Sequence, residues 1–177
     1  MLLSCCLLTA CTSFTASTHD HPDHEISGKI ALRQESGYAS LLFSWQETGD
    51  NYTLYLNNPL GQTELTLHGN RQQTTLLRAD GTSLTATSAE ALLKQSTGWD
   101  FPLSDIRFWL QGETTGTEEL LATNAEGLPE SFRTGPWLVT LEQYRPVEHQ
   151  LLPHRLVLKQ ANIEIILLVK QHARFHP

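Results

Sequence analysis

The chain has 177 residues, a formal net charge of −7 and 18% charged residues. This length suits one domain with a substantial core and is short for two. The acidic balance argues against a nucleic-acid partner, because phosphate binding requires a basic surface.

The chain begins with a short apolar segment followed by a polar one. Residues 2–11 are apolar or small, which is typical of the apolar region and cleavage site of a secretory signal. Leu8-Thr9-Ala10-Cys11 resembles a bacterial lipobox, which implies cleavage before Cys11 and acylation of its sulfur. A buried helical turn with incidental cysteines is the alternative. Residues 12–27 are rich in Ser, Thr, Pro and His and predict a flexible tether.

The predicted organisation is a signal peptide over residues 1–10, a lipidated N-terminus and tether over residues 11–27, and a single domain over residues 28–177. The tether carries histidines and carboxylates, which are residue types that ligate zinc or nickel: His19, Asp20, His21, Asp23, His24 and Glu25. A flexible segment presets no ligand geometry, so we interpret it as a solvated spacer and predict no metal and no cofactor. All three cysteines lie in the first eleven residues, which excludes a disulfide or a thiol active site in the domain.

From Gly28 the dominant hydrophobic period is two residues, which predicts β-strands. Strands are expected over residues 29–33, 41–45, 52–56, 64–68, 75–78 and 83–86, with turn signals between them. Two short helices follow, one capped by Ser88 and ended by Gly98, the other capped by Ser104 and ended by Gly112. Residues 113–130 predict a loop or an irregular strand, and strands resume over residues 137–144, 155–159 and 163–169.

This order predicts a mainly β fold, an open or incomplete antiparallel β-barrel with a short helical lid over an apolar cavity. The expected cavity lining is the inward apolar set: Phe43, Trp45, Leu54, Leu65, Leu67, Phe108, Trp109, Leu141, Ile165 and Leu167. Each of these residues also suits an ordinary packed core. The pattern does not distinguish a filled interior from a hollow one.

One loop carries a leucine where a polar turn is expected. Pro59 and Gly61 fix a tight bend, and Leu60 lies between them. Leu60 either folds back onto the sheet edge or points outward. An outward leucine forfeits about 1.5–3 kcal/mol of burial, which insertion into lipid recovers. We therefore predict that Pro59, Leu60 and Gly61 form a membrane-insertion loop.

Several segments, taken in order, resemble the LolB family, the outer-membrane lipoprotein receptors of Gram-negative bacteria. The resemblance covers roughly residues 28–170 and rests, with the lipobox, on Phe43-Ser44-Trp45-Gln46, Asn58-Pro59-Leu60-Gly61, Thr63-Glu64-Leu65-Thr66-Leu67, Ala89-Glu90-Ala91-Leu92-Leu93 and Ile106-Arg107-Phe108-Trp109-Leu110-Gln111-Gly112. Two features depart from the family pattern: a polar tether stands where family members carry an amphipathic helix, and the signal is short and lacks an early Lys or Arg.

The resemblance implies an activity without catalysis. A monomeric receptor, anchored through Cys11 in the outer membrane and facing the periplasm, would accept acylated lipoproteins from a LolA-like periplasmic carrier. It would hold their acyl chains in an apolar cavity and release them into the inner leaflet of the outer membrane. The family's protruding loop leucine corresponds to Leu60.

Three other functions fit parts of the pattern. The first is an anchored lipoprotein that binds a lipid or a small apolar ligand. The second is an anchored hydrolase, against which stands the lack of a Gly-x-Ser-x-Gly or His-Glu-x-x-His motif; we interpret His68, His149, His154 and His172 as solvated surface residues. The third is a structural envelope protein that acts through its surface.

Overall fold

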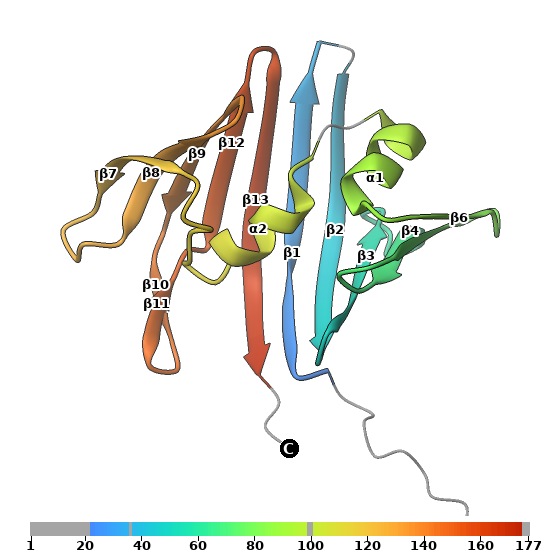
Figure 1. The fold of residues 1–177 in the computed structure, drawn as a ribbon, viewed down its shortest axis with the longest axis horizontal. Helices are drawn as coiled ribbons and strands as arrows, with labels where there is room; N and C mark the ends of the chain where they lie inside the picture. The colour runs from blue at the N-terminus through green and yellow to red at the C-terminus, as the bar shows by residue number, and fades with distance from the viewer. Residues whose placement is uncertain (1–21, 36, 99–100, 175–177) are drawn as a thin grey trace, which may run out of the picture.

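The computed structural model describes residues 22–35, 37–98 and 101–174, and most of them lie in one large antiparallel sheet (Figure 1). The strands are β1 (His24–Gln34), β2 (Gly37–Thr48), β3 (Asn51–Asn57), β4 (Thr63–Gly69), β5 (Thr74–Arg78), β6 (Ser83–Ala86), β7 (Glu119–Thr123), β8 (Pro129–Thr134), β9 (Trp137–Glu142), β10 (Arg145–Val147), β11 (Gln150–Leu152), β12 (Arg155–Gln160) and β13 (Ile163–Arg174). Two helices, α1 (Ala89–Thr97) and α2 (Leu103–Trp109), connect the two halves of the sheet.

The main sheet has eleven strands in the order β6-β5-β4-β3-β2-β1-β13-β12-β9-β8-β7. Strands β6 and β7 are its two edges, so the sheet curves without closing, and the predicted open antiparallel barrel is confirmed. Strands β10 and β11 pair separately as a hairpin. Both short helices lie on one face of the sheet, with α2 across its middle, in front of β13 and β1 (Figure 1).

The strict alternation of side chains gives the sheet one apolar face. The strand register aligns Ile26, Trp45, Leu54, Leu67 and Leu76 in one row across β1 to β5. All five side chains are buried in the core. Because strand residues two apart share a face, this row fixes which side of each strand meets the helices.

The centre of the sheet contains a position that requires glycine. Strand β1 changes register against β13 between Ser27 and Gly28. A Cβ atom at Gly28 would lie 2.1 Å from the carbonyl oxygen of Leu168, and the Phe43 ring lies 3.0 Å from the same point. The bulge and the missing side chain let β1 and β13 approach closely beneath an aromatic ring.

Helix α1 begins and ends as its sequence predicts. The Ser88 side-chain oxygen accepts a hydrogen bond from the Ala91 N–H at 3.2 Å. Gly98 adopts a left-handed conformation with φ of 76°, and its N–H donates to the Lys94 carbonyl at 2.9 Å. Both caps satisfy backbone groups that would otherwise lack partners at the helix ends.

The predicted cap of α2 was wrong. The helix is preceded by Pro102, which makes no side-chain capping bond, and Ser104 lies within the first turn. The Ser104 hydroxyl donates instead to Glu90 Oε1 at 2.6 Å, and the Ser104 N–H donates to the same atom at 2.8 Å. A carboxylate from α1 thus satisfies the start of α2, and this tertiary contact has no local sequence signal.

Other strand boundaries also differ from the predictions. Strand β1 begins at His24, so residues 24–27 belong to the sheet and not to the tether. Residues 113–130 contain the irregular strand β7, whose pairing with β8 shifts register twice. Strand β8 was missed because Phe132 is its only fully buried side chain. The hairpin of β10 and β11 was missed because each strand has three residues, too few to show a period.

None of the helices in the described part of the chain has the length and apolar character needed to cross a bilayer. Helix α1 has nine residues and α2 has seven. A spanning helix needs about 20 apolar residues. Both helices lie over the apolar face of the sheet, and this placement positions the candidate site.

Candidate functional site

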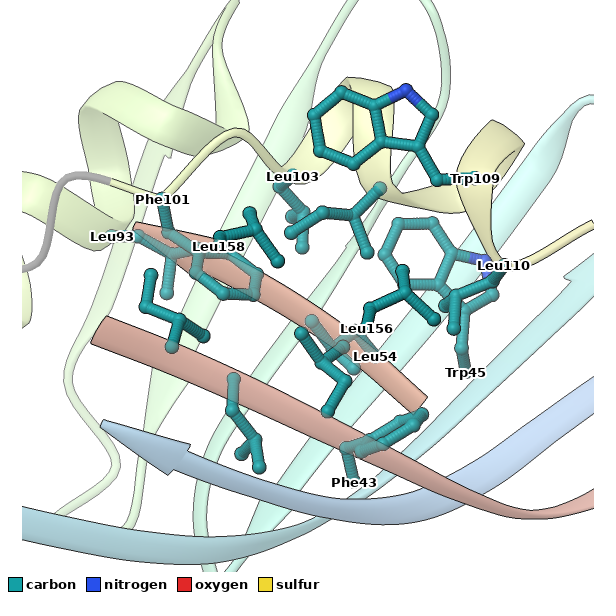
Figure 2. Close-up of a cluster of buried hydrophobic side chains, with 14 of the residues drawn as sticks. Phe43, Trp45, Leu54, Leu93, Phe101, Leu103, Trp109, Leu110, Leu156 and Leu158 are labelled. Atoms are coloured by element: carbon teal, nitrogen blue, oxygen red, sulfur yellow. The ribbon is translucent and has the colours of Figure 1, made fainter. Parts of the chain in front are cut away.

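The space between the buried face of α2 and the apolar face of the sheet is almost full. A small cavity of about 20 Å³ remains between the helix and the apolar face of the sheet. A volume of that size holds about one water molecule. Its walls come from both layers: Ile30, Phe43, Trp45, Leu54, Leu56 and Leu167 of the sheet, and Phe101, Leu103, Ile106 and Leu110 of the lid segment. Figure 2 shows Phe43, Trp45 and Leu54 of the sheet gathered with Phe101, Leu103 and Leu110 of the lid segment in one cluster.

The side chains that fill the interior come from the lid segment, which we define as residues 101–110. Leu103, Ile106 and Leu110 are each 1–2% exposed, and Phe101 is 6% exposed. Their spacing of three and four residues places them on one face of α2. This spacing was available in the sequence, yet these four residues were missing from the predicted cavity lining.

Of the ten residues predicted to line the cavity, four border it, five are buried elsewhere in the core, and Phe108 lies outside both groups. Phe43, Trp45, Leu54 and Leu167 surround the remaining cavity. Five others are buried in the surrounding core and do not border that cavity: Leu65, Leu67, Trp109, Leu141 and Ile165. In this conformation the interior is therefore closer to the filled alternative than to the hollow one.

Phe108 is a correction to the predicted lining. It lies on the outer side of α2, where the Arg107 guanidinium stands 5.1 Å from its ring centroid. The helical repeat of 3.6 residues explains this position, because a helix that points Ile106 and Leu110 inward turns Phe108 outward. Phe108 borders a surface pocket of about 450 Å³ between the helices and β2–β3.

Trp109 anchors the end of the lid. Its ring packs edge-on against Phe132 with centroids 5.2 Å apart, and its indole N–H donates to Glu118 Oε1 at 2.9 Å. Burial would raise the pKa of Glu118, but this bond and those from Thr115 outweigh burial and lower it to about 2. Glu118 is therefore ionised at neutral pH and holds the C-terminal end of the lid against β7 and β8.

Two acidic residues hold the rest of the lid. Glu47 Oε1 of β2 lies 3.6 Å from Arg107 Nε and also accepts the Trp45 indole N–H at 2.9 Å. Glu90 of α1 accepts both bonds from Ser104. Burial would raise the pKa of Glu90, but its hydrogen bonds outweigh burial and lower it. Three carboxylates thus hold the lid at its edges through polar contacts. Between them, the lid meets the sheet through apolar side chains.

The loop between β3 and β4 projects its leucine into solvent. Leu60 is 87% exposed, so the outward alternative is confirmed. Asn58 Oδ1 accepts the N–H groups of Leu60 and Gln62 at 3.0 and 3.1 Å, and Asn58 Nδ2 donates to Glu64 at 2.9 Å. Gly61 has a φ of 85°, which favours glycine. The loop is therefore a built feature that holds the leucine away from the sheet.

The Leu60 loop and the start of β1 lie at opposite ends of the sheet. His24 at the start of β1 pairs with Glu47, and Thr48 pairs with Asn51 at the start of β3. Strand β3 then runs away from that end toward the loop of Leu60. Cys11 and the predicted signal peptide lie outside the described residues.

Two of the carboxylates that were predicted to lie in the tether make structural hydrogen bonds. Asp23 accepts the Gly49 N–H at 2.7 Å, and Glu25 accepts the Ser44 hydroxyl at 3.0 Å. Within residues 22–35, 37–98 and 101–174 no group of His, Cys, Asp or Glu has metal-binding geometry. His19, Asp20 and His21 lie outside the described residues.

The description of His154 and His172 as solvated surface residues was wrong. The ring of His172 lies 5.3 Å from that of His154 and 6.5 Å from that of His24. Both ring nitrogens of His172 are buried. Burial, with the nearby His154 and His24, lowers the pKa of His172 to about 4. Strand pairing brings these distant positions together, so their spacing carries no signal.

The chain matches a known family over most of its length. The family model described as "Outer membrane lipoprotein LolB" matches residues 22–171. Curated relatives named "Outer-membrane lipoprotein LolB" include one from Bordetella petrii, 33% identical over 79% of this chain and 75% of the relative. Another, from Cellvibrio japonicus, is 31% identical over 82% of this chain and 75% of the relative.

Solved structures with the same fold are distant in sequence. A putative outer membrane lipoprotein-sorting protein domain from Vibrio parahaemolyticus aligns with a TM-score of 0.59 and 10% identity, over 86% of this chain and 85% of that one. A LolA superfamily protein from Nitrosomonas europaea aligns with a TM-score of 0.57 and 10% identity, over 88% of both chains. At this identity the likeness shows the fold only.

Proposed function

This chain belongs to the LolB family of outer membrane lipoproteins, and from that premise we propose that it is the outer-membrane receptor for newly sorted lipoproteins. It accepts acylated lipoproteins from a LolA-like periplasmic carrier and inserts them into the inner leaflet of the outer membrane. Cys11 carries the lipid that anchors the receptor facing the periplasm, and the receptor acts as a monomer. The process needs neither a catalytic residue nor a cofactor.

The family match over residues 22–171 carries this proposal, and the filled interior defines what acyl chains would have to displace. Phe101, Leu103, Ile106 and Leu110 occupy the space that acyl chains would take. Exposing four such side chains costs about 6–12 kcal/mol, at about 1.5–3 kcal/mol each. One chain of roughly 16 carbons gains about 12 kcal/mol at ~0.8 kcal/mol per methylene. Relative to water, burial of two or three acyl chains therefore outweighs the cost of displacing the lid, whereas chains handed over by a carrier are already buried and gain only the difference between the two interiors.

Direct transfer from a carrier follows from the same magnitudes. At ~0.8 kcal/mol per methylene, a multiply acylated cargo does not pass through water at a useful rate. The acyl chains must move from one apolar interior to another while the two openings face each other. The lid supports this arrangement, because its side chains keep the apolar face covered when no cargo is present.

Contact of Leu60 with the membrane supports the delivery step. An exposed leucine on a rigid loop recovers about 1.5–3 kcal/mol when it enters lipid. The loop stands roughly 30 Å from Asp23, by strand rise and strand spacing. Residues 12–22 reach about 40 Å when fully extended. An anchor at Cys11 is therefore long enough to let Leu60 touch the same membrane.

A transfer assay tests the proposed function. The lipid-anchored full chain in vesicles is mixed with a LolA-type carrier loaded with a fluorescent triacylated lipoprotein. We expect fluorescence to leave the carrier, to appear on the receptor and then to enter the lipid. If cargo stays on the carrier while the protein binds free fatty acid, the alternative of an anchored lipid-binding lipoprotein replaces the proposal.

A further inference from the structure

A second apolar depression lies outside the lidded interior. It has a volume of about 500 Å³, within the range of roughly 300–1,000 Å³ that is usual for small-molecule sites. Its floor consists of Ala39, Leu41, Leu56 and Leu65 from β2, β3 and β4. The end of α1 and the turn after β5 form its sides. We call this depression the end groove.

The end groove continues the apolar face of the sheet beyond the lid. Ala39 and Leu41 pack against the same core that α2 covers. Phe43 pairs with Leu56, and Leu56 pairs with Leu65, so the floor lies one strand position from the lidded cavity. Leu56 borders both spaces and therefore forms part of the wall of each.

The end groove also leads to the loop that carries Leu60. Asn58 borders the groove, and its side chain accepts the Leu60 N–H at 3.0 Å. Glu64, which accepts a bond from Asn58, lies on the same border. Leu56, Asn58 and Leu60 follow one another along the chain from the buried interior to the exposed tip.

We propose that the end groove is the exit path for an acyl chain, with Leu56 as the gate between interior and groove. The inference rests on the proposed function and adds the route that the lipid takes. During release one acyl chain slides past Leu56 and lies on Ala39, Leu41 and Leu65. It leaves the groove beside Leu60, where the loop enters the bilayer.

The chemistry of the end groove matches a hydrocarbon chain with a polar end. The floor is aliphatic, whereas the border carries Glu64, Arg78 and Asp80. Leu56 and Leu65 pair with strands on both sides, whereas Ala39 and Leu41 pair with β1 only, so the aliphatic side chains of the floor are what favour a hydrocarbon chain. A straight apolar chain buries itself on such a floor at no cost in unpaired polar groups.

Two matched substitutions test the exit path in the vesicle assay. Ala39→Trp places a large ring in the end groove, whereas Ser40→Trp places the same ring on the opposite face of β2, because adjacent strand residues point to opposite faces. We expect Ala39→Trp to accept cargo from the carrier at the wild-type rate and to lose most of its release into vesicles. Ser40→Trp should perform both steps normally.

A photo-crosslinking measurement keeps the test independent of folding defects. A benzophenone side chain replaces Ala39 or Ser40, and the probe is a synthetic diacylated lipopeptide loaded on the full-length protein. Crosslinks from position 39 to an acyl chain, and few from position 40, support the path. Normal release by Ala39→Trp, or equal crosslinking at both positions, overturns it. If the wild type accepts no cargo, the proposed function fails before this inference is reached.

Discussion

Arg107 of α2 and Glu47 of β2 form an ion pair that joins the outer side of the lid to the sheet, with 3.6 Å between Arg107 Nε and Glu47 Oε1. The separation exceeds that of a normal hydrogen bond, and the same oxygen accepts the Trp45 indole N–H. The pair is partly exposed, so we expect its contribution to be about 1 kcal/mol. Opening the lid must break it.

Glu47→Gln should therefore make the lid easier to open. The amide oxygen still accepts the Trp45 N–H, but the attraction to Arg107 is lost. A loss of about 1 kcal/mol corresponds to roughly fivefold faster uptake of a fluorescent fatty acid, measured by stopped-flow mixing. The control is Glu164→Gln, which removes ion pairs to Arg33 and Lys159 on the sheet, away from the lid. Equal acceleration in both variants would contradict the role assigned to Glu47.

Ile106→Ala should lower the free energy of unfolding and enlarge the cavity beneath α2. Ile106 is 1% exposed, and its truncation leaves a hole beside the existing cavity. We expect unfolding in urea to need about 2–4 kcal/mol less free energy, while fatty-acid affinity rises. The neighbouring Phe108→Ala, on the outer side of α2, should change stability much less. Weaker fatty-acid binding by Ile106→Ala would show that α2 does not occupy the ligand's space.

Leu60→Glu should separate uptake from delivery. The side chain is 87% exposed, so stability should change by less than about 0.5 kcal/mol. Loss of about 1.5–3 kcal/mol of apolar insertion predicts roughly 10–150-fold slower delivery to vesicles, with transfer from the carrier unchanged. Leu77→Glu, at another exposed leucine on β5, is the control. Delivery at the wild-type rate by Leu60→Glu would refute membrane contact by the loop.

The contacts of His172 with His24 and His154 predict that the folded protein loses stability in acid. The pKa of His172 is lowered from 6.5 to about 4 in the folded protein, chiefly by burial, whereas the unfolded chain keeps the ordinary value. The unfolded state then binds more protons between these limits, and stability falls as the pH drops from 6.5 toward 4. His24, whose pKa burial also lowers despite Glu47, acts in the same direction.

The expected loss is roughly 2 kcal/mol across that window, because partial solvent access reduces the full effect of the shift. Urea unfolding of the wild type and of His172→Phe at several pH values measures it. The variant should show a flatter profile below pH 6.5. Identical slopes for the two proteins would remove His172 from the explanation.

The length of the tether should limit delivery. Deleting residues 13–20 leaves a reach of about 14 Å from Cys11 to Asp23, well short of the roughly 30 Å to the Leu60 loop. Delivery by the anchored full chain should fall at least about fivefold, because the shortened tether lets Leu60 reach the membrane only when the domain lies along the surface. A Gly-Ser segment of the same length should restore it. Unimpaired delivery after the deletion would mean that anchor and loop do not act on one membrane.

Local sequence determined the strands, the caps of α1 and the loop of Leu60. Alternation with a period of two requires only neighbouring residues, so the central residues of β1 to β5, β12 and β13 were predicted, although β1, β2 and β13 extend several residues beyond the predicted bounds. Ser88 and Gly98 satisfy their own helix ends through short-range bonds. Pro59 and Gly61 fix a bend whatever surrounds it, although the exposure of Leu60 was left open until the fold was known.

The tertiary structure decided how the interior is used. The helical repeat indicates which residues of α2 share a face, but not that this face fills the space expected to be hollow. The bond from Ser104 to Glu90, the contact of His24 with His172 and the end groove beside Leu56 each join segments distant in the chain. Such contacts depend on strand order and curvature. Sequence periodicity indicates which residues are buried. The packing of the assembled sheet against the lid determines whether those residues fill the interior or line a cavity.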